Sequence, residues 1–567
     1  GGLSLSAEDN AALNECYDVL LVARVALHRA TGRPGDTLRL EDQDAAAAAA
    51  GAPSADAFMA DIAAAARTVA WIADESWGRV GKPTGGSPRE VAPGVMLIDG
   101  EMELAVDADP AVDPTYVLRI ATAAARHSAR IGRRSLDRLA ELVPEWPARW
   151  PAGAVDKLVA LLLEGHRAIP VIEALDQRGL VSRMLPEWEP VRSRPQRNAY
   201  HRFTVDRHLW EAAANAAEIA DRVARPDLLV LGALFHDIGK GSPGDHTEVG
   251  MEIVGELAPR LGLPDRDVDV LVAMVEHHLL LPDVAMRRDL SDPATIAHVA
   301  DVVRDPERLE LLHALTIADS KATGPSAWSD WKEGLVAELV ARVAHVVGGG
   351  DVSEATWTLF PDAETVAMMA TGDTHVQVFD DRLVVVYRDV PGAFSRIAGV
   401  VSLHGLDVLA ARAHSDEHQL GRMSMGASEF RVQVPKDGID WAPIERDLDR
   451  ALRGQLAIEA RLIERARTYR RRRAVQAAEP GPPRVVFHDE ASSNATVVEV
   501  RCQTKIGILY RITKALAEVG LDIRHATVQT VGLDVVDTFY VRDWSGELIT
   551  DPHHRTEIER AVLHAIG

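Results

Sequence analysis

The sequence predicts a multidomain chain in which an all-α leader and a second all-α domain precede two α+β domains of ferredoxin-like type. Up to about residue 347, apolar residues recur at spacings of three and four, the period of amphipathic helices. Gly348-Gly349-Gly350 interrupts this pattern, and β-branched runs alternate with helical ones beyond it. The order strand, turn, helix, strand, strand then occurs twice, at residues 375–475 and 484–567. The 567 residues, of which 47% are hydrophobic, suffice for several globular domains.

The first 195 residues are rich in Ala and Leu and are expected to form the helical leader. A run of alanines spans residues 45–50, and prolines gather near residues 144–151 and 186–195. Because proline interrupts helices, the second proline group marks the end of the leader. We therefore place the next domain at residues 196–347.

A histidine beside an aspartate is the most informative feature of that second helical domain. His236 and Asp237 follow a long apolar run and precede a glycine-rich turn. Both side chains are costly to bury unless a partner satisfies them, and a metal ion is the usual partner. His208 begins an amphipathic helix upstream, and Asp319 ends an apolar-periodic segment downstream. The alternative, a helix-terminal histidine near a capping carboxylate, does not account for four such residues in order.

Further residues extend this candidate site. His246 opens the next predicted helix, and His277 and His278 lie together on the helix after it. Since neighbours on a helix point in different directions, one of the pair is expected to join the site; we assign His277, and the sequence leaves the choice open. Lys240 follows the His-Asp pair closely enough to neutralise a phosphate, although an exposed lysine is the commoner arrangement. One bound ion and two bound ions are both compatible with this set.

The candidate residues have two roles. The catalytic candidates are His236, Asp237 and Lys240. The candidate metal ligands are His208, His236, Asp237, His246, His277 and Asp319. Nitrogen and carboxylate donors without a thiolate suit Zn, Mn, Fe or Mg, so the identity of the divalent metal is undecided. Such an ion activates water for attack on phosphorus, which makes phosphoester hydrolysis the expected chemistry.

Composition excludes several classes of protein. A net charge of −23 argues against nucleic acid as a partner, because phosphate neutralisation needs clustered cations. The basic run at residues 465–473 is interpreted as the solvated end of a helix. Cys16 and Cys502 are the only cysteines and lie far apart, so we expect no disulfide framework and a cytoplasmic protein. No apolar run approaches the roughly 20 residues of a membrane span, so no membrane partner is expected.

Each α+β domain has a glycine where a turn meets the start of a helix. The first has the turn Asp389-Val390-Pro391-Gly392. The second has Thr504 and Ile506 in place of the aspartate and the proline, and keeps only Gly507. Glycine at this point lets backbone amides face a ligand at the helix start, where carboxylates bind well. The alternative is that either domain is a structural module that mediates dimer contacts.

These features resemble known families. The order His, His-Asp, Asp on successive helices resembles the HD superfamily of metal-dependent phosphohydrolases, and the two α+β domains resemble tandem ACT domains. A helical leader, an HD domain and two ACT domains in this order resemble the bifunctional uridylyltransferase/uridylyl-removing enzymes, which modify the nitrogen regulatory protein PII. Residues 22–33, 201–208 and 507–512 look like segments of that family, and the resemblance covers nearly the whole chain.

The resemblance implies a function for each part. The HD domain would hydrolyse the nucleotidyl-tyrosine phosphodiester on PII and release UMP, or AMP if this relative adenylylates instead. The ACT domains would sense glutamine at Asp389, Pro391, Gly392 and Gly507, and would join two chains in a homodimer. Two other classes stay open: an HD phosphohydrolase acting on a free nucleotide or alarmone under amino-acid control, and a non-catalytic scaffold gated by ACT domains.

The nucleotidyltransferase domain of that family has no convincing counterpart in the sequence. The domain carries a Gly-Ser turn with an Asp-x-Asp metal site shortly after it. Gly86-Ser87 and Asp107-Ala108-Asp109 are too far apart to match, and they lie in the region that resembles the family's linker. We therefore expect residues 1–195 to be the helical linker domain that follows a missing transferase domain.

Overall fold

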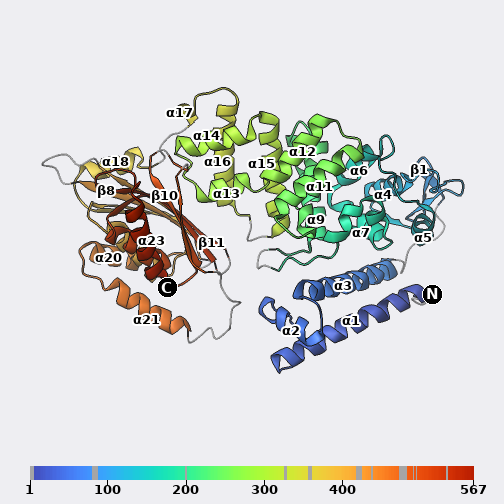
Figure 1. Ribbon diagram of the computed structural model, residues 1–567, viewed down its shortest axis with the longest axis horizontal. Helices are drawn as coiled ribbons and strands as arrows, with labels where there is room; N and C mark the ends of the chain where they lie inside the picture. The colour runs from blue at the N-terminus through green and yellow to red at the C-terminus, as the bar shows by residue number, and fades with distance from the viewer. Residues whose placement is uncertain are drawn as a thin grey trace. The chain divides into compact units, whose positions relative to one another are not determined.

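The chain forms two compact units in the computed structural model (Figure 1). Unit 1 comprises Gly1–Leu281 and Asp305–Glu333, and unit 2 comprises Pro282–Arg304 and Gly334–Gly567. The structure describes residues 5–78, 87–197, 201–324, 328–355, 360–416, 424–435, 438–470, 482–489, 491–492, 494–531 and 534–567. The helical domain predicted at residues 196–347 is thus divided between the two units, because Pro282–Arg304 and the residues after Glu333 pack with unit 2.

The leader is helical, as the sequence predicts, and it also holds a small sheet that the sequence does not predict. Its helices are α1 (Ala7–Thr31), α2 (Gln43–Ala50), α3 (Ala55–Gly78), α4 (Tyr116–Arg126), α5 (Arg133–Leu142), α6 (Ala154–Leu162), α7 (Ile169–Asp176) and α8 (Leu180–Met184). The four-stranded sheet has the order β1 (Arg89–Ala92), β2 (Val95–Ile98), β3 (Glu101–Leu104) and β4 (Arg130–Ile131). Strands this short lie below the length at which alternation of apolar residues can be recognised.

The helices that carry the candidate metal ligands share one hydrophobic core with the leader. They are α9 (Val205–Glu218), α10 (Pro226–Phe235), α11 (His246–Leu261), α12 (Asp265–His277) and α15 (Pro306–Thr323). Helix α10 is apolar on every side, and its residues from Leu228 to Phe235 are all buried. A helix that is apolar all round belongs in the interior of a domain. Its C-terminal end therefore delivers the next residue, His236, to a fully buried position.

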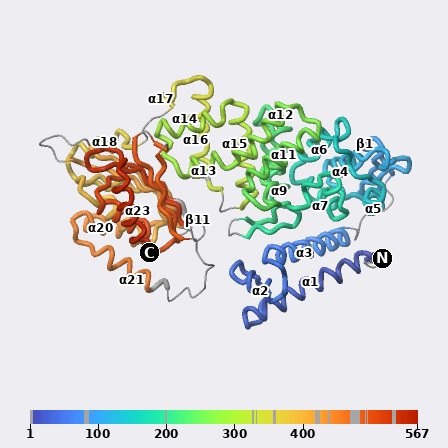
Figure 2. Tube along the Cα trace, in the orientation of Figure 1, coloured from blue at the N-terminus to red at the C-terminus, as the bar shows by residue number. Residues whose placement is uncertain are grey.

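The chain leaves unit 1 between two of these helices. The tube in Figure 2 follows it from α12 through α13 (Leu280–Arg287) and α14 (Pro293–Val303) to α15. Residues 282–304 of this path pack with unit 2, and the chain is back in unit 1 at Asp305. The segment Pro282–Arg304 of the second helical domain therefore packs with the unit that holds the α+β domains.

Unit 2 is built on one eight-stranded sheet. Its order is β5 (His375–Val378), β6 (Arg382–Arg388), β8 (Met425–Val432), β7 (Val408–Ser415), β11 (Leu521–Val531), β12 (Asp534–Asp543), β10 (Thr496–Gln503) and β9 (Arg484–His488). The predicted order of strand, helix, strand and strand is present in both halves. The halves join through antiparallel pairing of β7 with β11, in which Arg412 lies opposite His525. The edge strands β5 and β9 directly precede their neighbours β6 and β10 in the chain.

Helices cover one face of this sheet. Residues from α19 (Ala393–Leu403), α20 (Trp441–Leu452), α21 (Ile458–Arg470), α22 (Ile508–Glu518) and α23 (Pro552–Ile566) form one core with the strand residues of that face. On the opposite face, Met369 of α18 (Ala363–Ala370) packs on β6 and β8, and Tyr540 packs on Val497. Unit 2 also holds α17 (Val352–Ala355) and most of α16 (Asp330–Val347). The opposite face is thus only partly covered by these helices and clusters.

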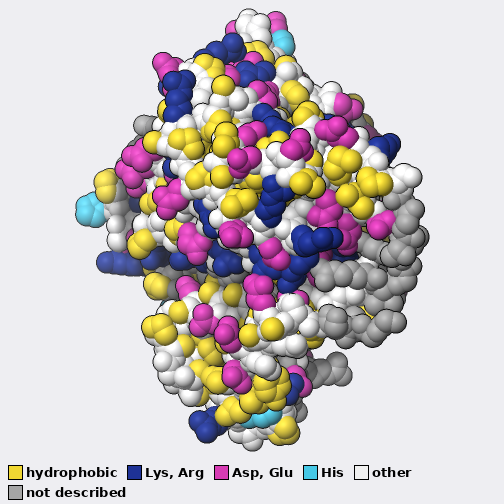
Figure 3. Space-filling view, turned by 90° about the vertical axis from the view of Figure 1, so that its right-hand side faces the viewer, with side chains coloured by type: hydrophobic (Ala, Val, Ile, Leu, Met, Phe, Trp, Pro, Cys, Tyr) yellow, Lys and Arg dark blue, Asp and Glu magenta, His cyan; other side chains and the backbone are white. Residues whose placement is uncertain are grey.

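Charged side chains of both signs and hydrophobic side chains, such as Tyr17 and Trp77, are exposed on the surface. On the face shown in Figure 3, Lys and Arg side chains are interspersed with Asp and Glu. Among the described residues, no helix combines the length and the apolar character that a membrane crossing requires.

Candidate metal centre

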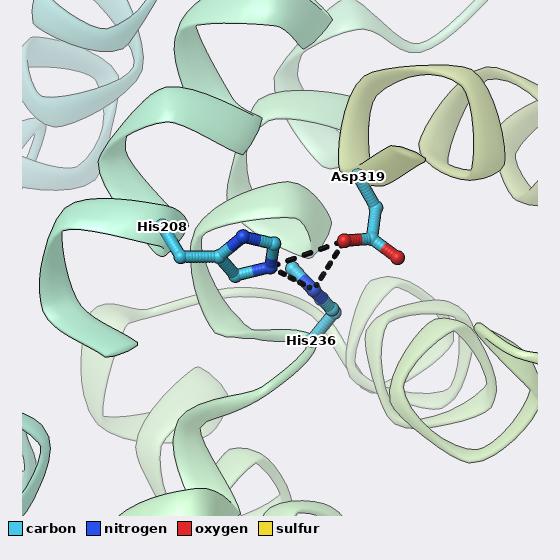
Figure 4. A group of neighbouring side chains, drawn as sticks. All are labelled: His208, His236 and Asp319. Carbon is cyan, nitrogen blue, oxygen red and sulfur yellow. Dashed lines mark hydrogen bonds and ion pairs between the residues drawn. The ribbon is translucent and has the colours of Figure 1, made fainter. Parts of the chain in front are cut away.

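Three predicted ligands meet inside unit 1 (Figure 4). His208 comes from α9, His236 follows the last residue of α10, and Asp319 comes from α15. The His208 Nε2 and His236 Nε2 atoms are 3.3 Å apart, and Asp319 Oδ1 lies 3.1 Å from the first and 3.5 Å from the second. Both histidines are buried, with 1% and 0% of their surface exposed. Three donor atoms thus converge on one point.

A second group of donors adjoins the first. It consists of Asp237, His246 and His278, whose ligand atoms also lie within 4.8 Å of one another. Asp237 Oδ1 faces this group, 3.8 Å from His246 Nε2 and 3.6 Å from His278 Nε2. Asp237 Oδ2 faces the first group, 3.6 Å from His208 Nε2 and 3.4 Å from His236 Nε2. The carboxylate of Asp237 therefore bridges the two groups.

The orientation of the histidine rings fits metal binding. His236 Nδ1 lies 2.9 Å from the Ala233 carbonyl oxygen, and His278 Nδ1 lies 2.7 Å from the Val275 carbonyl oxygen. Since a carbonyl only accepts, each Nδ1 carries the proton and each Nε2 is left with a lone pair. In addition, Asp237 Oδ1 is buried and accepts no hydrogen bond from the described residues. Lone pairs and an unsatisfied carboxylate oxygen aimed at one interior point are what a divalent cation requires.

The buried carboxylates of the centre also require a positive charge beside them. Burial alone would raise the pKa of the Asp237 and Asp319 carboxyls, yet both pKa values lie well below the usual range because His236 and its cationic neighbours stabilise the ionised forms. Burial alone would lower the pKa of His236, but the two carboxylates raise that pKa to about 10. Two ionised carboxylates in a dry interior are thus balanced by a cation, a role that a metal ion fills as well as a proton.

The structure places His278, and not His277, beside the other donors. His277 is the last residue of α12, and its Nε2 lies 3.6 Å from Glu276 on the surface side. His278 is 3% exposed and faces Asp237. The buried residues of α12 include Val270 and Ala273, which precede His277 by seven and four positions, and Leu271 and Met274, which precede His278 by the same spacings. Helical periodicity therefore could not choose between the two histidines from the sequence.

Replacing each neighbour in turn should separate their roles. We expect His278→Ala to lower metal-dependent hydrolysis by more than about 10-fold, because it removes a donor that faces Asp237, and His277→Ala to leave the rate within about 2-fold of the parent protein. The measurement is initial rate at saturating metal, together with metal content after dialysis. Equal losses in the two variants would contradict the donor set given above.

Lys240 and two neighbours that the sequence did not single out adjoin the centre. Lys240 Nζ donates to Asp237 Oδ2 and, at 3.0 Å, to Gln196 Oε1. The His201 ring lies edge-on to His208, with ring centroids 5.4 Å apart, and its pKa is lowered to about 4 by burial and by the charge of Lys240. Lys240 is therefore an ion-pair partner of the bridging carboxylate rather than an exposed lysine.

A buried network ties the leader to the start of α9. Arg67 of α3 forms ion pairs with Glu173, Asp176 and Asp206 at 2.6, 2.8 and 2.9 Å. Asp206 also accepts the Ser193 N–H. These partners lie far apart in the sequence, so no local sequence pattern predicts the network. Because Asp206 lies on the same helical turn as His208, the network fixes the helix end that presents this ligand.

The predicted effector turns are formed at both helix starts of the ACT pair. Gly392 has φ 79° and precedes α19, and Gly507 has φ 76° and precedes α22. Asp389 borders a cavity of about 700 Å³ in unit 2, whereas Pro391, Gly392 and Gly507 are not among its lining residues. The structure therefore does not bring the four predicted effector residues into one site.

The described residues of the candidate transferase motif do not come together in one site. Gly86 lies outside the described residues, and Ser87 is exposed. Asp107 is exposed, and Asp109 Oδ1 accepts the Ala111 N–H within its own loop. Neither aspartate belongs to a metal-binding group among the described residues.

Buried His and Asp donors on successive helices, joined to a paired α+β sheet, define a metal-dependent phosphohydrolase of the HD class with ACT domains. Family models agree: the HD domain matches residues 205–304, the ACT domain matches residues 496–543, and GlnD PII-uridylyltransferase matches residues 3–77. The bifunctional uridylyltransferase/uridylyl-removing enzyme of Streptomyces coelicolor is 40% identical over 94% of this chain and 72% of its own length. The chain belongs to the family of bifunctional uridylyltransferase/uridylyl-removing enzymes.

Other relatives of the same name align with it. The enzyme of Mycobacterium tuberculosis is 38% identical over 98% of this chain and 70% of its own length. The enzyme of Gluconobacter oxydans is 31% identical over 70% of this chain and 49% of its own length. The family expected from the sequence is thereby confirmed.

Proposed function

We propose that this chain hydrolyses the nucleotidyl-tyrosine phosphodiester of PII and so removes the uridylyl group. The observation that carries the proposal is the pair of buried donor groups bridged by Asp237, in a chain whose relatives are named for uridylyl removal. UMP is the product that those names indicate. AMP would be released if the group on PII were an adenylyl group.

The donors suit one or two divalent metal ions. In the proposed arrangement, one ion is held by His208, His236 and Asp319, and the other by Asp237, His246 and His278. Each group offers two imidazole nitrogens and one carboxylate, which favours Mn, Fe or Zn over Mg, because Mg prefers oxygen ligands. When bound, such ions activate water and neutralise charge on the phosphoryl oxygens.

The chain's own side chains supply orientation and charge. The carbonyls of Ala233 and Val275 fix the rings of His236 and His278, so that no ligand has to reorient. Lys240, held by Asp237 and Gln196, places an ammonium group beside the donors, where it can balance the charge of a phosphodiester. These positions support the proposed catalytic set of His236, Asp237 and Lys240.

Glutamine is the proposed effector, and the turn with Asp389, Pro391 and Gly392 is its proposed contact. The left-handed backbone at Gly392 lets the start of α19 present backbone amides to a carboxylate. Gly507 forms the equivalent turn before α22. Glutamine is expected to raise hydrolysis, as in the family. The proposed cytoplasmic homodimer would use surfaces other than β7 and β11, which already pair within the chain.

Incubation of the purified chain with uridylylated PII tests the function directly. With Mn²⁺ present we expect release of UMP and recovery of unmodified PII, both measured by mass spectrometry, and a faster release with glutamine. Adenylylated PII and free nucleotides serve as competing substrates in parallel reactions. Hydrolysis of free nucleotides or alarmones without action on PII would favour the small-molecule phosphohydrolase, and no hydrolysis with metal bound would favour the scaffold.

Nucleotidyl transfer is expected to be absent from the 567-residue chain. The Gly-Ser and Asp-x-Asp residues that transfer needs do not form a site among the described residues. Purified protein should therefore incorporate no labelled nucleotide from UTP or ATP into PII at any glutamine concentration. Labelled PII in this assay would show that the region around Ser87 and Asp109 has been misinterpreted.

A further inference from the structure

His208 differs from the two donor histidines whose rings are fixed by backbone carbonyls. The Nδ1 atoms of His236 and His278 lie at hydrogen-bond distance from carbonyl oxygens. His208 Nδ1, by contrast, is buried and has no hydrogen-bond partner among the described residues. A metal-binding histidine without such a partner keeps its orientation only through packing and through the position of its helix. The direction of His208 Nε2 therefore depends on how the first turn of α9 is held.

The first turn of α9 is held by groups that lie outside the helix. Its N-cap, Thr204, makes no side-chain capping bond within the described part of the chain. Asp206, two residues before His208, instead accepts two bonds at its Oδ2 atom. The Ser193 N–H donates at 2.8 Å and the Arg67 guanidinium at 2.9 Å. The carboxylate of Asp206 thus ties the start of α9 to the leader helix α3.

Arg67 reaches this turn as the centre of a poorly hydrated set of charges. Its side chain is 17% exposed and pairs with Glu173 at 2.6 Å and with Asp176 at 2.8 Å, besides Asp206. Asp176 is fully buried and also pairs with Arg192 at 2.8 Å. Two arginines therefore face three carboxylates, and each charge depends on the placement of the others. A change at Arg67 has to be absorbed by its carboxylate partners, one of which lies on α9.

A second contact joins the leader to the metal centre through the segment just before α9. Arg197 donates to Asp44 at 2.6 Å and to Asp56 at 3.3 Å, both at the leader helices α2 and α3. The preceding residue, Gln196, accepts a bond from Lys240 Nζ at 3.0 Å. Lys240 in turn pairs with the bridging carboxylate of the centre. This segment is thus held by the leader on one side and by the centre on the other.

Helix α3 belongs to two hydrophobic cores, and Arg67 lies between them. Phe58 packs in a core that α1, α2 and α3 share, whereas Trp71 packs in the core of the helices that carry the candidate metal ligands. The GlnD PII-uridylyltransferase model covers residues 3–77, and the HD model begins at residue 205. The Arg67 network therefore joins the two matched regions by direct polar contacts.

We propose that Arg67 is a positioning residue of the metal centre and that the helices α1–α3 are thermodynamically coupled to that centre through it. The network holds Asp206, and with it the first turn of α9, at the point where His208 meets His236 and Asp319 (Figure 4). Because coupling is reciprocal, bound metal stabilises the contact of α3, and a displaced α3 weakens metal binding. The inference rests on the proposed metal centre and adds a leader residue to the groups that it requires.

Arg67→Lys tests the positioning role, with Arg133→Lys as the matched control. Lysine keeps the charge but lacks the planar fork that serves several carboxylates at once. Arg133 has the same exposed fraction, 17%, and pairs with Asp9 of the leader. Calorimetry of the full chain with Mn²⁺ alone should show binding at least about 10-fold weaker in Arg67→Lys. Arg133→Lys should stay within about 2-fold of the parent protein, because its partners are separate from the network.

The rate at saturating metal separates positioning from a direct part in the reaction. The donor atoms remain in Arg67→Lys, so excess Mn²⁺ should restore hydrolysis of bis(p-nitrophenyl) phosphate to within about 3-fold of the parent rate. Unchanged Mn²⁺ affinity in a folded Arg67→Lys protein, or an equal loss in Arg133→Lys, would overturn the proposal. A rate that stays more than about 10-fold low at saturating Mn²⁺ would also overturn it, because Arg67 would then act in the reaction itself.

Hydrogen exchange on the unmutated chain tests the coupling without any variant. Mn²⁺ should slow exchange in residues 60–72 of α3 and in residues 192–197, but not in residues 89–104 of the small sheet, which lie outside the network. Slower exchange in α9 without any change in α3 would overturn the coupling. A chain that binds Mn²⁺ and shows these changes, but does not hydrolyse modified PII, would refute the proposed function and leave this inference intact.

Discussion

Asp237→Ala should abolish metal-dependent hydrolysis and strip metal from both donor groups. The Asp237 carboxylate faces His208 and His236 with one oxygen and His246 and His278 with the other, so its loss weakens every group at once. We expect a loss of more than about 100-fold in rate, since even partners outside the ligand shell contribute about 10- to 100-fold in such sites. The assay is release of nucleotide from modified PII, with metal content determined by mass spectrometry.

Folding has to be separated from metal loss in this variant. The parent protein should be stabilised by added Mn²⁺, because a ligand that binds only the native state raises the melting temperature, and Asp237→Ala should lose that shift while it still unfolds cooperatively. Asp221→Ala, at an exposed aspartate of unit 1, is the matched control and should keep activity and the metal-dependent shift. A folded, fully active Asp237→Ala protein would end the interpretation of these residues as a metal centre.

The principal candidate metal ligands could be predicted because each lies at a position that local patterns define. His236 and Asp237 directly follow the buried apolar run of α10, His208 lies on the amphipathic α9, and Asp319 follows the apolar segment of α15, so local pattern and residue type suffice. The bridging of two groups by Asp237 could not be predicted in the same way. It depends on how α9, α10, α11 and α12 cross, and the sequence of one helix does not specify its crossing angle with another.

The packing of Pro282–Arg304 with unit 2 could not be predicted from the sequence, and the reason is physical. The pattern of α14 shows that one of its faces is buried, but not which surface buries it. In the structure α14 packs within unit 2, and its N-cap Asp292 binds Ser492, about 200 residues away. The Arg67 network has the same character, since Asp206 is 139 residues from Arg67. Long-range polar contacts produce no periodic pattern in the sequence, so they cannot be predicted from it.

The turns of the proposed effector site could be predicted in part for a related reason. Positive φ at Gly392 and Gly507 follows from the turn chemistry that the sequence displays. Leu462 of α21 lies 2.9 Å from the position that a side chain at Gly507 would take, whereas the nearest atom at Gly392 is the Ser395 hydroxyl at 3.5 Å. Of the first turn, Asp389 borders the cavity of unit 2, and Pro391 and Gly392 do not. Two turns that are equivalent in the chain thereby become unequal in the fold, and the first is the one to test.

Gly392→Val should abolish the response to glutamine. Gly392 has φ 79°, a backbone conformation that costs an L-residue about 1–2 kcal/mol and a β-branched residue the most. A valine would drive the turn out of the conformation in which the start of α19 offers its amides to a carboxylate, and the ligand would lose that contact. The ratio of hydrolysis rates with and without glutamine should fall to about one, whereas a coupled site usually gives about 5-fold or more.

Backbone strain alone must be excluded as the cause, and a second glycine of the same unit allows this. Gly372 has φ 74°, and no atom lies within 4 Å of the position that a side chain would take. Gly372→Val therefore introduces similar strain away from the turn, and it should lower the melting temperature by a similar amount while it keeps the glutamine response. If both variants respond to glutamine as the parent protein does, and calorimetry shows unchanged binding, the turn is not part of the effector site and the ACT pair has a structural role there.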